Sequence, residues 1–92
     1  MKKIKLENGC YKEIHYWDAE ETKIKSERYY NRRYEFNRLN GPAIIYYYEH
    51  IKIRTKEYFI NGKRYLKEEF YKQLEVIKIK NINRNLKLLN KK

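Results

Sequence analysis

The sequence predicts an α+β fold, in which an antiparallel sheet of about five strands carries a C-terminal helix packed on one face. Three observations lead to this prediction. Residues 1–66 alternate in strand-like fashion between turn signals, and part of this region occurs twice, at about 9–36 and 41–65. After Tyr65 the apolar spacing changes from two residues to about 3.6, which is the helical period. Residues 67–92 are therefore expected to form a basic helical segment of the same domain.

The expected strands follow one another from turn to turn. Residues 3–7 and 10–14 form a hairpin around Asn8-Gly9, a pair suited to a tight turn because both residues tolerate positive φ. The first repeat pairs residues 10–17 with 23–30 around a turn at 18–22. After a loop at 37–42, the second repeat pairs residues 43–49 with 52–60, and Asn61-Gly62 turns into a short segment at 63–65.

Alternation along the last long strand assigns its side chains to two faces. The face expected to pack beneath the helix carries Ile51, Ile53, Thr55 and Phe59. The other, basic face carries Lys52, Arg54, Lys56 and Tyr58, and the first repeat adds Lys25 and Tyr29. Of the run Tyr46-Tyr-Tyr48, two rings are expected to pack under the helix and Tyr47 to be a contact residue.

A helix is expected to begin after Leu66. Phe70, Leu74 and Ile77 lie at i, i+4 and i+7, and Glu68 and Glu69 favour the positive end of the helix dipole. Residues 76–80 are β-branched and fit either a helix or a strand. Asn81 can cap a second short helix with an apolar stripe of Ile82, Leu86 and Leu89.

The second repeat carries a family signature. Its segments, Asn-Gly-Pro-Ala-Ile-Ile-Tyr-Tyr-Tyr at 40–48 and Glu-Tyr-Phe-Ile-Asn-Gly-Lys at 57–63, resemble the MORN-variant repeat of bacterial, phage and large-DNA-virus proteins. The upstream copy is looser: Gly9 lies 32 positions before Gly41, and Ile24 lies 29 before Ile53. The resemblance implies a two-stranded antiparallel unit per repeat, and it implies no enzyme activity.

The residues themselves form no recognisable catalytic or metal-binding motif. His15 and His50 are the only histidines, and neither stands at a metal-ligand spacing from Cys10 or from a carboxylate pair. Cys10 and His15 fall on opposite faces of one strand, and no glycine-rich phosphate loop is present. We therefore expect no enzyme activity, no cofactor and no metal.

Charge is the strongest functional signal. The formal net charge is +11, and residues 72–92 hold seven Lys or Arg against one Glu. The lack of a signal peptide or an apolar span, together with a single cysteine, leads us to expect a soluble cytoplasmic protein with no membrane or small-molecule partner. A basic surface bearing tyrosines favours nucleic acid or a host nucleoprotein complex as partner, as for a phage-type inhibitor resembling an anti-CRISPR.

The residues expected to contact the partner are Lys25, Tyr29, Tyr47, Lys52, Arg54, Lys56, Tyr58, Lys78, Lys80, Arg84 and Lys87. Lysine-rich usage without function is the plain competing explanation of the charge, because exposed strand lysines also protect sheet edges. The alternative function is a protein-interaction module, antitoxin-like or forming a homodimer through the apolar stripe of the tail.

Overall fold

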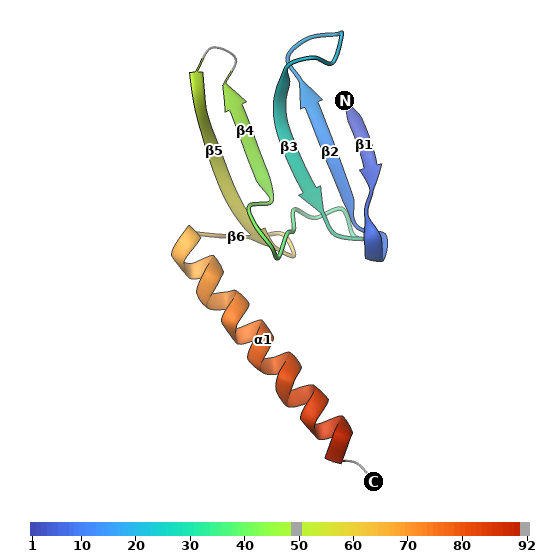
Figure 1. Ribbon diagram of the computed structural model, residues 1–92, viewed down its shortest axis with the longest axis vertical. Helices are drawn as coiled ribbons and strands as arrows, with labels where there is room; N and C mark the ends of the chain where they lie inside the picture. The colour runs from blue at the N-terminus through green and yellow to red at the C-terminus, as the bar shows by residue number, and fades with distance from the viewer. Residues whose placement is uncertain (49–50, 91–92) are drawn as a thin grey trace.

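The computed structural model describes residues 1–48 and 51–90, without the side chains of 51–53 and 81–90. One antiparallel sheet has its strands in chain order (Figure 1). The strands are β1 (Lys2–Lys5), β2 (Tyr11–Tyr16), β3 (Ile24–Tyr30), β4 (Ile44–Tyr48), β5 (Ile51–Ile60) and β6 (Lys63–Tyr65). They are followed by the helix α1 (Lys67–Asn90). The α+β prediction is confirmed, with a sixth short strand beyond the five expected.

The connection between β1 and β2 has the backbone that the sequence predicts. Asn8 and Gly9 both have positive φ, at 61° and 74°. The chain forms a short 3-10 turn at Glu7–Gly9, and the Leu6 amide donates to the Cys10 carbonyl at 2.9 Å. A Cβ on Gly9 would lie 2.9 Å from Arg32, whose guanidinium donates to the Asn8 carbonyl. Gly9 therefore serves both the turn and this close contact.

Matching positions of the two repeats meet in space. The hairpin β2–β3 belongs to the first repeat and β4–β5 to the second, and β3 pairs with β4. Phe36 lies between Tyr30 and Phe59, at ring-centroid distances of 5.0 and 5.2 Å. The side-chain amide of Asn31, just after β3, donates to the side-chain oxygen of Asn61, just after β5, at 3.2 Å. The loop after β3 thus joins the repeats at one end of the sheet.

The strand register defines two faces of the sheet. Cross-strand partners share a face, and the pairs Lys12–Tyr29, Tyr47–Arg54 and Tyr58–Tyr65 lie on the face that α1 contacts, the helix-side face. The opposite, far face carries Glu13, Ser26, Tyr30, Tyr46 and Phe59. The sequence-based assignment of the helix to the face of Phe59 is therefore wrong. The helix packs on the face of Tyr58, which was expected to be the open basic face.

The helix packs only through its first turns. Tyr58, Ile60 and Phe70 form a buried cluster against which Tyr65, Leu74 and Ile77 pack. Beyond that contact α1 runs away from the end of the sheet (Figure 1). The Tyr46–Tyr48 run is not beneath the helix, contrary to expectation, because α1 contacts β5 and β6.

The segment from 76 to 90 is one helix, continuous with the preceding turns, with no second helix starting at Asn81. Straight-chain and leucine side chains around the β-branched residues 76–79 favour this outcome. At 24 residues the helix is about 36 Å long. Among the described residues, no helix is both long and apolar enough to cross a membrane.

Candidate functional site

Cationic side chains flank a tyrosine ring at the centre of the helix-side face. Tyr29 on β3 has the Arg38 guanidinium 4.0 Å from its ring centroid and the Lys12 ammonium 5.2 Å from it. Lys12 reaches the ring from β2 because the two residues are cross-strand partners. Arg38 comes from the loop before β4, where Asn40 and the Pro42 carbonyl accept hydrogen bonds from it. The ring is half-buried beneath two cations.

One carboxylate lies among these cations. Glu27 on β3 is 3.2 Å from the Lys12 ammonium and accepts a 2.7 Å hydrogen bond from the Tyr47 hydroxyl. Partial burial alone would raise the pKa of Glu27, but the hydrogen bonds from Tyr47 and Lys12 hold that pKa below its usual range. Among the described strand residues of the helix-side face, Glu27 is the only acid. The face therefore keeps an excess of positive charge.

Tyr47 links this group to β5. The Arg54 guanidinium lies 5.4 Å from the Tyr47 ring centroid, and the two residues are cross-strand partners. Burial and the Glu27 carboxylate raise the pKa of Tyr47, so its hydroxyl stays protonated and donates. Contacts thus run from Lys12 through Glu27 and Tyr47 to Arg54, across four neighbouring strands.

A basic cavity lies beside this row, where β5, β6 and the start of α1 meet. Its volume is about 430 Å³, and its charged lining residues are Arg54, Lys56, Glu57, Arg64 and Lys67. Arg64 is 3.2 Å from the Glu57 carboxylate, so part of its charge is neutralised. Arg54 and Lys56 are exposed, and no ion pair is recorded for them among the described residues. Together they present two available charges next to the helix start.

The structure brings together four of the expected contact residues and separates others. Tyr29, Tyr47, Arg54 and Lys56 lie on the helix-side face. Lys25 lies apart, at a break in the β2–β3 register, with its ammonium 5.0 Å from the Trp17 ring. Tyr58 is 6 % exposed beneath Phe70, so its assignment as a contact residue is wrong. The strand alternation was read correctly, but the helix covers this ring.

The remaining expected contacts belong to α1 or to undescribed side chains. Lys78 and Lys80 are exposed on the helix beyond its contact with the sheet. The side chains of Lys52, Arg84 and Lys87 lie outside the described residues, as do the whole of Glu49 and His50.

Lys12 and Arg38 were not among the contact residues predicted from the sequence. The pairing of residues 10–17 with 23–30 was predicted, but read residue by residue it places Lys12 opposite Arg28. The register break beside His15 moves the partner of Lys12 to Tyr29. Arg38 lies outside the paired strands, and its position depends on the fold of the 31–43 loop. Charge and periodicity alone therefore do not locate residues whose neighbours depend on a register break or on a loop.

The far face carries an arrangement that looks catalytic but is structural. His15 hydrogen-bonds Glu13 at 3.1 Å and is the cross-strand partner of Ser26. Ser26 is fully buried, and its hydroxyl accepts from Arg28 at 3.3 Å. A substrate cannot reach the Ser26 hydroxyl, so these residues form a polar network whose hydrogen bonds are satisfied within the protein. Within the described part of the chain, no cluster of three or more metal-ligating side chains occurs.

Comparisons with protein-family models, curated proteins and solved structures found no match to this chain.

Proposed function

We propose that the protein binds nucleic acid, free or within a nucleoprotein complex, through the helix-side face and the adjoining surface of α1. The observation that carries the proposal is the alternation of cations and tyrosine rings across β2–β5. Tyr29 lies between Lys12 and Arg38, and Tyr47 lies beside Arg54. Phosphates pair with such cations and release counterions, while tyrosine rings offer stacking surfaces to bases.

The placement of the helix supports the same function. Because α1 starts on the helix-side face and continues past the end of the sheet (Figure 1), its exposed Lys78 and Lys80 add positive charge beyond the strands. The exposed cations Arg54 and Lys56 border the helix start. A phosphate chain following this border would meet strand cations first and helix cations next. This favours contact along a backbone over contact with a single small anion.

Fluorescence anisotropy tests the proposal. Labelled single-stranded RNA, single-stranded DNA and duplex DNA are titrated with the protein at several salt concentrations. We expect binding that weakens steeply as salt rises, because each phosphate contact releases condensed counterions. Absence of binding to all three ligands at low salt would reject direct nucleic-acid binding. Capture of a nucleoprotein from lysate, with and without nuclease, then shows whether phosphate contacts are needed.

A second function is favoured by a separate observation on α1. Ile79 is 55 % exposed and Val76 is 41 % exposed on a helix that extends past its contact with the sheet. In the sequence Ile79 precedes Ile82, Leu86 and Leu89 at helical spacing. This stripe suits self-association or a protein groove. Sedimentation at increasing salt separates the two functions: screening of the basic tails would strengthen a homodimer and weaken nucleic-acid binding.

A further inference from the structure

An exposed indole is held at the end of the sheet away from β6. Trp17 follows β2 and is 43 % exposed. Its Nε1 donates to the Tyr47 carbonyl at 3.3 Å, which spans β3 to reach β4. The Trp17 side chain is therefore outside the buried core, and its hydrogen bond to Tyr47 restrains the orientation of the ring. Such a fixed, accessible ring is suited to stacking with a flat ligand.

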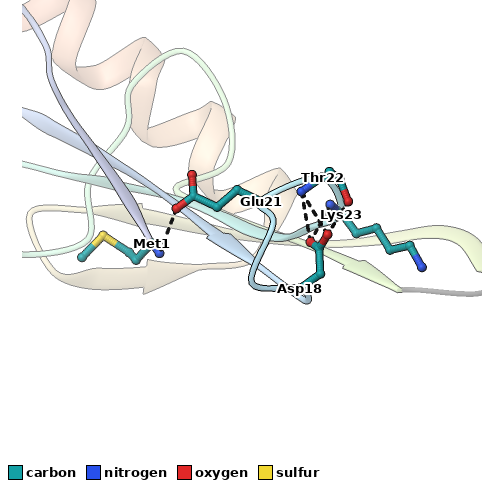
Figure 2. Close-up of polar contacts among 5 residues, drawn as sticks. All are labelled: Met1, Asp18, Glu21, Thr22 and Lys23. Carbon is teal, nitrogen blue, oxygen red and sulfur yellow. Dashed lines mark hydrogen bonds and ion pairs between the residues drawn. The ribbon is translucent and has the colours of Figure 1, made fainter.

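The turn after Trp17 fixes the backbone that carries it. Figure 2 shows the Asp18 carboxylate accepting from the Thr22 and Lys23 amides, at 3.1 and 2.9 Å. The Thr22 hydroxyl also donates to Asp18. The Trp17 amide donates to the Lys23 carbonyl at 2.8 Å, closing the turn. At the far side of the turn Glu21 is 3.8 Å from the Met1 ammonium (Figure 2).

The indole forms one wall of a cavity of about 320 Å³. The cavity is lined by Trp17, Lys25, Tyr46, Tyr47, Tyr48 and Thr55. The Tyr48 hydroxyl hydrogen-bonds Thr55 at 2.8 Å, which holds a second exposed ring in place. The volume is near the lower limit of small-ligand sites, about 300–1,000 Å³. It suits one ring system rather than an extended ligand.

Among the described lining residues the cation is Lys25, and its charge indicates what a bound ring should carry beside it. The Lys25 ammonium lies 5.0 Å from the Trp17 ring centroid, and among the described residues no carboxylate lines the cavity. A ligand that combines a flat ring with a neighbouring negative charge fits both features. An unpaired base and its phosphate make that combination, whereas a base within a duplex is stacked and cannot enter.

We propose that this cavity receives one unpaired base of a single-stranded nucleic acid, stacked on Trp17, while Lys25 binds the adjoining phosphate. The inference rests on the proposed nucleic-acid binding and narrows it to single strands. When the base stacks, the Lys25 ammonium leaves the ring face and pairs with the phosphate oxygen. The cavity thus adds a stacking contact for a base to the phosphate contacts made by the helix-side cations.

Intrinsic fluorescence tests the proposal, because Trp17 is the only tryptophan. The protein is titrated with a short oligothymidylate and with an abasic deoxyribose-phosphate strand of the same length. We expect the base-bearing strand to quench Trp17 and the abasic strand to leave it unchanged. The abasic strand should bind at least about tenfold more weakly, because it loses the stack on Trp17 together with any stacks on Tyr29 and Tyr47.

Variants separate stacking from folding. Trp17→Ala should weaken oligothymidylate binding about tenfold, measured by anisotropy, and leave abasic binding unchanged. Trp17→Phe keeps a ring and should lose much less. Leu39→Ala, which removes another exposed apolar side chain (48 % exposed), should change neither. A misfolded Trp17→Ala protein would lose abasic binding as well.

The outcomes are distinguishable from those of the proposed function. Equal binding of both strands without quenching would overturn the base site and leave phosphate binding intact. Quenching that persists with duplex DNA at equal affinity would overturn the preference for single strands. Failure of every strand to bind would reject the proposed function, and the base site with it.

Discussion

The hairpins β2–β3 and β4–β5 have similar sequences, but the tyrosine that each carries at the same repeat position is covered by different groups. Tyr29 on β3 corresponds to Tyr58 on β5, and both rings lie on the helix-side face. Phe70 of α1 lies 4.9 Å from the Tyr58 ring, whereas the Arg38 guanidinium lies 4.0 Å from the Tyr29 ring. The helix has made one tyrosine part of the core. The other keeps a charged cover that a ligand can displace.

Tyrosine truncation should have its largest effect on stability in the second hairpin. Tyr58→Ala removes a ring that is 6 % exposed and packed on Phe70, and we expect a loss of about 3 kcal/mol in the free energy of unfolding. Tyr29→Ala should cost only about 1 kcal/mol, because its ring is half-buried under cations. Urea unfolding followed by circular dichroism measures both. Equal losses would remove the distinction between core and contact tyrosines.

Asn31 and Asn61, which directly follow β3 and β5, should also differ in their contribution to stability, by less than the two tyrosines. The Asn31 side chain accepts from the Arg33 and Glu35 amides, each at 3.0 Å, and donates to the Glu35 carboxylate. Asn31→Ala should therefore cost about 2 kcal/mol of unfolding free energy.

The control for Asn31→Ala is Asn61→Gly. Asn61 has a φ of 47°, a backbone conformation that glycine adopts readily, so this variant should lose less than about 1 kcal/mol. A larger loss for Asn61→Gly than for Asn31→Ala, measured by urea unfolding, would show that the loop after β3 does not depend on Asn31.

Glu27→Gln should move stability and binding in opposite directions. It removes the charged acceptor of Lys12 and Tyr47, at a cost of about 1.5 kcal/mol near neutral pH. It also releases Lys12 to a phosphate, so nucleic-acid affinity should rise about threefold, within the range for one added charge contact. Loss of affinity would show that Glu27 organises the surface rather than weakening it.

The same variant has a defined pH dependence. The folded pKa of Glu27 lies below its ordinary value of 4.5, so the folded state favours the ionised form. The stabilisation is fully present above the unfolded pKa and is lost as pH falls through the folded pKa. The difference in unfolding free energy between wild type and Glu27→Gln should therefore shrink below about pH 4.5. A difference that grows on acidification would contradict this sign.

Periodicity and turn signals predicted most of the fold. Asn8-Gly9 marked the first turn, the alternation of residues 24–30 and 53–59 gave the strands, and Phe70, Leu74 and Ile77 gave the packed helix stripe. Which face the helix would cover was mispredicted. Both faces of β5 carry large rings, Tyr58 on one and Phe59 on the other, so alternation alone does not decide between them.

The candidate site was predicted only in part, for the same physical reason. Arg54, Lys56 and Tyr47 follow from strand alternation, and the structure keeps them on one face. The position of Arg38 depends on the fold of a loop, and the position of Trp17 depends on a break in the strand register. Local sequence specifies neither. The MORN-variant resemblance stays a prediction, since it rests on the repeated residues alone.

The most direct test is a matched pair of charge reversals. Arg54→Glu/Lys56→Glu inverts two exposed cations of the helix-side face. Lys5→Glu/Arg33→Glu changes the net charge equally at exposed positions outside that face. We measure the affinity of both for single-stranded nucleic acid by anisotropy at one salt concentration. A loss of about 100-fold for the first pair and less than about fivefold for the second is the predicted result. Equal losses would show that net charge alone, and not this face, drives binding.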